Sequence, residues 1–136
     1  MKQQIFLALL LSVGFTARAQ KTTFDLKQSI SSGREIYTIN CQSCHMEQGE
    51  GLEGVYPPLA KSDYLMADKK RSIKQIIGGI SGSITVNGTE YNSEMPGYTL
   101  SDEEIAHVLN YIRNNFGNKG AAVTPAEVAE QRRLIK

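Results

Sequence analysis

The chain has 136 residues, with 15 lysines and arginines against 14 aspartates and glutamates, so its formal net charge is +1. This length suits one domain with a single core. The near-neutral charge balance argues against a nucleic-acid binder, because such proteins carry a strongly basic face. The sequence contains no internal repeat and no low-complexity tract.

The N-terminal stretch MKQQIFLALLLSVGFTARAQ has the pattern of a secretory signal peptide. A positive charge at Lys2 precedes an apolar run at residues 5–11, and Ala17-Arg18-Ala19 forms an A-x-A step. The apolar run is shorter than the ~20 residues that a membrane span needs. We therefore predict a signal peptide at residues 1–19, export to the periplasm, and no stable membrane span after cleavage. Without Lys2 and Arg18, the remaining chain has 15 − 2 = 13 basic and 14 acidic side chains.

Two helical patterns flank a region that is predicted to be a loop. The first helix is expected to begin near Ser29 to Ser32, where Ser32 and Glu35 have the spacing of a capping box. Residues 46–67 hold three glycines and two adjacent prolines, a composition typical of loops. A second helix from about Asp68 to Ile77 has isoleucines at helical spacing and is followed by two glycines.

The strongest helical pattern is LSDEEIAHVLNYIRNNFGN. Ser101 and Glu104 form a second capping box at its start, and Gly117 is predicted to end it. Further on, Pro125 after Thr124 could open a short extra helix, since proline is favoured at the first helical position. The predicted buried face of the long helix consists of Ile105, Val108, Leu109, Ile112 and Phe116.

Between the second and the long helix, Asn87-Gly88 lies between short alternating runs and predicts a small two-stranded hairpin. The resulting organisation is a lead-in at residues 20–28, a domain at 29–118 and a C-terminal tail at 119–136. Apolar residues are few for a domain with this much predicted loop. We therefore expect another group to occupy its centre.

The motif Cys41-Gln-Ser-Cys44-His45 contains the only two cysteines of the chain. A disulfide between them would close a very short loop and stabilise little. A thioredoxin-like redox pair needs a βαβ pattern, which the surrounding sequence lacks. A zinc site would have to recruit His107, 62 residues beyond His45, without a paired ligand. The fourth interpretation is covalent haem attachment, for which C-x-x-C-H is the signature.

Haem attachment explains the spacing of the motif and the sparse core. Two thiols three residues apart on a helical turn can reach the two vinyl groups of one haem, and His45 can then bind the iron. A haem attached in this way supplies the apolar volume that the sequence lacks. We therefore predict one covalently bound haem c, held by Cys41, Cys44 and His45.

The function depends on the second axial position of the iron, because six-coordinate haem mainly transfers electrons and five-coordinate haem binds gases or peroxide. Met46 is adjacent to His45 and cannot reach the opposite face of the haem. Met66 precedes the isoleucine-rich helix, where we expect it to pack. His107 lies off the apolar face of its helix and is expected to be solvated.

Met95 is the remaining candidate for the distal ligand. It lies in a polar loop, where a methionine has no core to pack into, and Pro96 and Gly97 stiffen that loop. Ligation by methionine and histidine raises the reduction potential of a haem relative to two histidines.

These residues together resemble the class I cytochromes c, over about residues 29–118. Gly33 and Tyr37 precede Cys41 by eight and four residues, as the family places a small residue and an aromatic residue in its first helix. Tyr111 stands at the aromatic position that packs over that glycine in the family. The resemblance implies a mainly α, cytochrome c fold, with three to five helices around one haem and a small β-hairpin before the methionine loop.

The resemblance also extends to the two sides of the haem. The sequence PPL, with Pro57 twelve residues after His45, is similar to the family's P-x-L turn, where the proline carbonyl accepts the ring N–H of the ligating histidine. MPGY is similar to the family's distal loop, with Met95 as the ligand. The sequence from Val55 to Asn118 is similar to the sequences of small monohaem cytochromes. It is also similar to those of the cytochrome domains fused to periplasmic dehydrogenases and copper nitrite reductases.

The implied function is electron transfer in the periplasm by a monomer without catalytic residues, and the implied partners are a dehydrogenase, a reductase or a terminal oxidase. The alternative is a haem-based gas-binding or sensor protein with a labile distal ligand. Two charge runs could orient a redox partner. The basic run is Lys69, Lys70, Arg71 and Lys74, and the acidic run is Glu47, Glu50 and Glu53.

Overall fold

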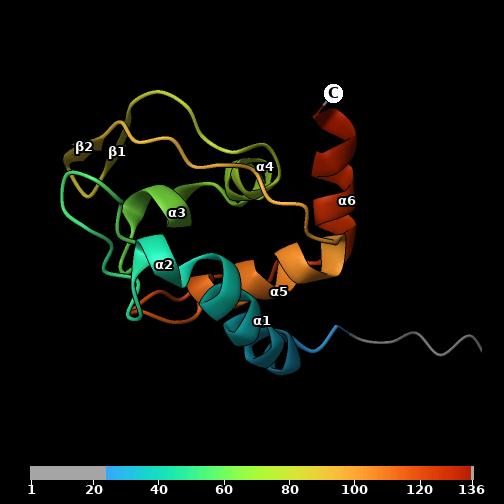
Figure 1. The fold of residues 1–136 in the computed structure, drawn as a ribbon. Coiled ribbons are helices and arrows are strands. Elements are labelled where there is room, and N and C mark those ends of the chain that lie inside the picture. The colour runs from blue at the N-terminus through green and yellow to red at the C-terminus, as the bar shows by residue number, and fades with distance from the viewer. Residues whose placement is uncertain (1–23, 136) are drawn as a thin grey trace, which may run out of the picture.

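The computed structural model describes residues 24–135, so the predicted signal peptide lies outside the described residues. Six helices and one hairpin are present in the described part of the chain (Figure 1). The mainly α fold with a hairpin before Met95 is confirmed, and two single-turn helices raise the helix number above the predicted three to five. The elements are α1 (Leu26–Asn40), α2 (Gln42–His45), α3 (Asp63–Ala67), α4 (Lys69–Gly78), β1 (Ile84–Val86), β2 (Thr89–Tyr91), α5 (Asp102–Arg113) and α6 (Pro125–Leu134).

Two predicted helix boundaries were wrong, and one predicted loop contains a short helix. Helix α1 begins at Leu26 rather than near Ser29 to Ser32, because the Asp25 carboxylate caps it. Within the predicted loop, the Ser62 side chain caps the short helix α3. Helix α5 starts with the predicted capping box but ends at Arg113, before Gly117.

The crossing of α1 and α5 is the central contact of the fold and is visible below the other helices in Figure 1. Gly33 permits it, because a Cβ at this position would lie 2.0 Å from the carbonyl oxygen of His107 and 2.8 Å from Cβ of Tyr111. Next to the crossing, the rings of Tyr37, Tyr111 and Phe116 pack with centroids 5.2–5.5 Å apart. The two helices therefore form a rigid base beneath the cysteine motif.

The predicted hairpin is present as an antiparallel β1–β2 pair, with Ile84 opposite Tyr91. Asn87 and Gly88 both have positive φ, 50° and 82°, as the tight turn requires. The turn is attached to α3, because Asp63 accepts a hydrogen bond from the Asn87 amide and donates its own amide to the Asn87 side chain. The hairpin is thus fixed to the helical part of the molecule.

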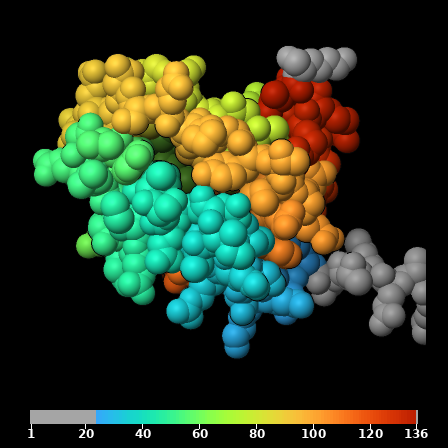
Figure 2. Space-filling view, in the orientation of Figure 1, coloured from blue at the N-terminus to red at the C-terminus, as the bar shows by residue number. Residues whose placement is uncertain are grey.

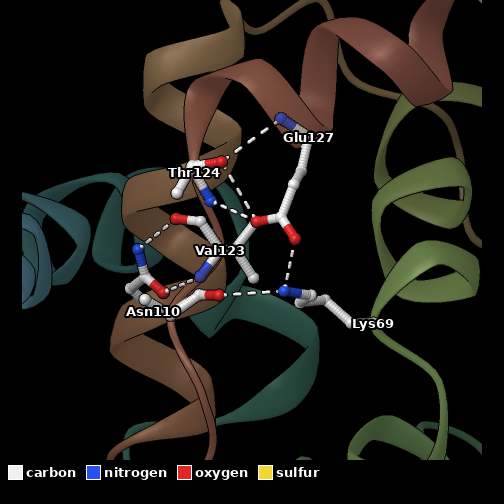
Figure 3. A network of polar contacts seen from close by, with 6 residues as sticks. Lys69, Asn110, Val123, Thr124 and Glu127 are labelled. Atoms are coloured by element: carbon white, nitrogen blue, oxygen red, sulfur yellow. Dashed lines mark hydrogen bonds and ion pairs between the residues drawn. The ribbon is translucent and has the colours of Figure 1, made fainter. Parts of the chain in front are cut away.

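Helix α6 follows Thr124, whose hydroxyl forms a capping box with Glu127, and it packs on α4 and α5. Asn110 on α5 pairs with both backbone groups of Val123, and Lys69 on α4 bonds to Glu127 and to the carbonyl of Ala122 (Figure 3). Burial alone would raise the pKa of Glu127, but the bonds from Lys69 and Thr124 outweigh it and lower the pKa. The segment after residue 119 is therefore joined to the helical core by specific polar contacts.

Candidate haem site

A predominantly apolar cavity lies between the cysteine motif, the hairpin and the loop that carries Met95. Its empty volume, which includes space open to solvent, is about 1070 Å³. Figure 2 shows the mouth as a hollow framed by α2, the loop that follows it, the hairpin and the segment before α5. The lining includes all five predicted site residues, Cys41, Cys44, His45, Pro57 and Met95.

The cysteine motif forms the junction of α1 and α2. The Cys41 amide still donates to the Tyr37 carbonyl, and the carbonyl of Cys41 accepts from the amide of His45. Burial, with a smaller contribution from Cys44, raises the pKa of the Cys41 thiol to about 12. Both cysteines are free thiols that line the same cavity, so no disulfide occupies the motif.

The Pro57 carbonyl determines which tautomer His45 adopts. Nδ1 of His45 lies 3.0 Å from the Pro57 oxygen, and a carbonyl can only accept, so Nδ1 carries the proton. Burial lowers the pKa of His45, while the bond to Pro57 opposes that shift. The neutral ring therefore keeps the lone pair of Nε2 available as a ligand.

Two glycines shape the loop between His45 and Pro57. Gly49 has a φ of 68°, and a Cβ there would lie 2.6 Å from the ring of Phe116. Gly51 has a φ of 66°, and a Cβ there would lie 2.3 Å from the Tyr56 carbonyl oxygen. These positions require glycine, and the compact loop brings the Pro57 carbonyl to His45.

The backbone of Met95 is fixed by a two-way hydrogen-bonded bridge to Ile80, with N···O distances of 2.9 and 3.1 Å. On either side, Gly79 and Gly97 allow two chain segments to pack backbone to backbone, since a Cβ on either would lie 2.5 Å from a carbonyl oxygen. The Tyr98 hydroxyl donates to the Asn40 carbonyl and thereby connects this loop to the end of α1. The Met95 loop is thus bonded both to the segment that contains Ile80 and to the end of α1.

The other candidate ligands lie elsewhere. Met66 packs against the hydrophobic core, as predicted, and does not line the cavity. His107 is half-buried rather than solvated, because its Nδ1 bonds to Ser29 near the start of α1. Ser29 and Cys41 are twelve residues apart along α1, or about 18 Å at the rise of a helix. His107 therefore cannot join the motif in a zinc site, and residues 24–135 contain no cluster of three or more His, Cys, Asp or Glu side chains that could hold a metal ion.

One wall of the cavity was not predicted from the sequence. The Tyr64 hydroxyl accepts a 2.7 Å hydrogen bond from Gln75, and both residues line the cavity. The Arg71 guanidinium lies 3.7 Å from the centroid of the Tyr64 ring and donates to the Tyr64 carbonyl. The hairpin adds the buried Val86 and Tyr91 to this wall. No local pattern reveals this group, because its members meet only when α3, α4 and the hairpin pack.

The residues fit a flat, apolar macrocycle that contains a metal. Two thiols line one side of an apolar cavity, and an imidazole and a thioether reach it from separate segments. Soft sulfur and imidazole ligands are those that iron takes in haem proteins. This arrangement in a helical domain is typical of proteins that hold a covalently attached haem within a shell of helices.

The comparisons with known proteins agree with this class. Residues 30–116 match the family model for Cytochrome c, and the chain belongs to this family. Members of the family carry covalently bound haem c with its iron, and they transfer electrons rather than catalyse a reaction.

Two groups of relatives are similar to the chain. It is 36% identical over 115 residues to cytochrome c-552 of Thermus thermophilus, covering 78% of this chain and 87% of the relative. It is 34% identical over 100 residues to the cytochrome c subunit of a quinone-type alcohol dehydrogenase of Gluconobacter oxydans, covering 71% of this chain and 20% of that subunit. The chain thus spans about a fifth of that subunit. Among the described residues, no helix is long and apolar enough to cross a membrane.

Proposed function

We propose that the chain carries one haem c, attached through thioethers to Cys41 and Cys44, with His45 and Met95 as the axial ligands. The observation that carries this proposal is the convergence of these four side chains on one cavity. The bond from His45 to Pro57 supports it, because it leaves Nε2 free to face a metal. Pro57 then acts as the group that orients the proximal ligand.

The bound haem iron supplies one-electron redox chemistry. The protein would hold both proposed ligands in place. His45 is held by the Pro57 carbonyl, and the Met95 backbone is held by its bridge to Ile80. Because neither ligand needs to move, the proposed site suits rapid electron transfer, and the fixed Met95 loop disfavours the alternative of a sensor with a labile distal ligand.

We further propose that the protein is a monomeric electron carrier of the periplasm that shuttles between redox enzymes. The signal-peptide pattern at residues 1–19 supports the location. The similarity to cytochrome c subunits of alcohol and gluconate dehydrogenases supports a dehydrogenase as the donor. A reductase or a terminal oxidase would be the acceptor.

The ligand assignment is tested by comparing Met95→Ala with the matched control Met66→Leu, each produced in a host that matures haem c. The ferric wild type should show the long-wavelength sulfur-to-iron band. Met95→Ala should lose this band and have a lower reduction potential, while Met66→Leu should keep both. An unchanged spectrum and potential in Met95→Ala would refute Met95 as the ligand.

The covalent attachment and the sensor alternative need separate measurements. The haem should stay with the protein during acid extraction, and a colourless protein would end the haem proposal as a whole. The ferrous wild type should bind carbon monoxide slowly or not at all, because in the proposed site Met95 would compete for the iron. Rapid binding would favour the gas-binding protein over the electron carrier.

A further inference from the structure

The surface around the cavity mouth has a charge composition unlike that of the rest of the chain. We define the mouth surface as residues 41–60 and 79–98, the two stretches that frame the hollow in Figure 2. These stretches contain no lysine, arginine or aspartate, although the chain has 15 basic residues. Their charged side chains are Glu47, Glu50, Glu53, Glu90 and Glu94, and all five are exposed.

These five carboxylates are not neutralised by any residue that the structure describes. The ion pairs within residues 24–135 are Lys69–Glu127 and Arg132–Asp102, which lie on α4, α5 and α6. Glu50 accepts a hydrogen bond from the Gln48 amide, which leaves its charge intact. The mouth surface therefore carries a local charge of about −5 on a nearly neutral chain.

Large apolar side chains are exposed among these glutamates. Leu52 and Val55 are 47% and 39% exposed, and they lie in the turn next to Glu50 and Glu53. An exposed apolar centre with a charged periphery is the composition of a protein-docking patch, in which the centre excludes water and the rim selects the partner.

The basic run at residues 69–74 cannot, as a whole, serve as a docking surface. Lys69 is bonded to Glu127 and to the Ala122 carbonyl, and Arg71 packs on Tyr64. These two charges serve to hold α6 and α3. The run also belongs to α4, outside the stretches that frame the mouth.

We propose that the mouth surface docks a redox protein whose contact patch has a lysine- or arginine-rich rim around an apolar centre. This inference rests on the proposed electron transfer, since docking at the mouth places the partner next to the cavity. Because the whole chain is close to neutral, the separation of charge orients the approaching partner rather than increasing its overall attraction. The complex is short-lived and weakens as salt is added.

The test uses the purified haem-loaded protein in its reduced form and two small outer-sphere oxidants of opposite charge. Tris(phenanthroline)cobalt(III) is the cation and ferricyanide is the anion, and their rates are measured by stopped flow over a series of ionic strengths. The rate with the cation should fall as salt rises, by about tenfold from low to high salt, and the rate with the anion should rise.

Variants then locate the charge responsible. Glu47→Gln/Glu53→Gln/Glu90→Gln should flatten both salt dependences, and the corresponding lysine variant should reverse them. The matched control is Glu35→Gln/Glu103→Gln/Glu130→Gln, which removes three exposed carboxylates from α1, α5 and α6 and should behave as the wild type. Equal flattening by the control would overturn the proposal, because the effect would then follow net charge rather than the mouth.

A protein-sized test uses voltammetry on electrodes coated with monolayers. The wild type should exchange electrons on an amine-terminated monolayer and fail on a carboxylate-terminated one, and the lysine variant should show the opposite preference. Electron exchange with both oxidants but without any charge preference would refute the docking surface alone. Absence of reaction with both oxidants and both electrodes would instead refute the proposed electron transfer.

Discussion

Gly33→Ala gives the sharpest test of how the fold supports the site. In the structure a Cβ on residue 33 would lie 2.0 Å from the His107 carbonyl oxygen and 2.8 Å from Cβ of Tyr111. Both neighbours belong to the backbone or to the base of a side chain, so a rotamer change cannot relieve the contact. The α1–α5 crossing must open by about 1.4 Å to bring the Cβ to an ordinary contact distance of 3.4 Å from the His107 oxygen, which is a form of overpacking.

Overpacking of this kind typically costs about 1–3 kcal/mol. Alanine in place of a helical glycine returns at most about 1 kcal/mol through its helix propensity. Because the clash involves a backbone carbonyl, we expect the upper end of the range and a net loss of about 2 kcal/mol in the free energy of unfolding. Gly78→Ala is the matched control, since Gly78 is also helical and a Cβ there would meet nothing within 4 Å.

The assay is guanidinium unfolding of the haem-loaded variants, followed by far-ultraviolet circular dichroism. Gly33→Ala should shift the midpoint to lower denaturant, and Gly78→Ala should leave it unchanged or raise it slightly. A Gly33→Ala variant as stable as the wild type would show that the close helix approach is not required by the fold.

Three further predictions concern the rest of the structure. In Gly97→Ala the new Cβ would lie 2.5 Å from the Ile77 carbonyl oxygen, so the loop must shift and displace Met95. The sulfur-to-iron band should therefore weaken, and an unchanged band would contradict this. Asn110→Leu leaves both backbone groups of Val123 unpaired and should lower the free energy of unfolding, measured with denaturant, by at least about 2 kcal/mol. A decrease of less than about 0.5 kcal/mol would argue against this role of Asn110. The folded state lowers the pKa of Glu127, so its contribution to stability is present above its unfolded pKa and is lost as the pH falls through the folded value. In Glu127→Gln the thermal midpoint should therefore fall less steeply on acidification than in the wild type, and parallel curves would refute this linkage.

The sequence alone determined the features that depend on neighbouring residues. The cysteine motif occupies a single turn, the turn of the hairpin needs only Asn87-Gly88, and the capping box at Ser101 is complete within four residues. The cofactor class followed from the same local signals, and the family match agrees with it. The roles of Cys41, Cys44, His45 and Met95 stay predictions.

The start of α1 shows where local reasoning fails. Ser32 and Glu35 have the spacing of a capping box, but the Asp25 carboxylate caps the helix earlier, at Leu26. Ser29, a predicted start, is instead buried inside α1, where its hydroxyl contacts His107 and Asn110 from α5. The Asp25 cap is a local contact that competes with Ser32 and Glu35 for the helix start. The burial of Ser29, in contrast, depends on residues about 80 positions away, which local spacing cannot reveal.

Only the tertiary structure decided how the cavity is closed and which charges remain free. Tyr64 and Gln75 form a wall because α3 and α4 pack together. Lys69 pairs with Glu127 instead of facing a partner, because α6 lies against α4. Such contacts join residues that are distant in sequence, so no periodicity or spacing records them. The physical reason is that a capping box or a tight turn is satisfied within one turn of chain, whereas the burial and pairing of a side chain depend on what the rest of the fold places beside it.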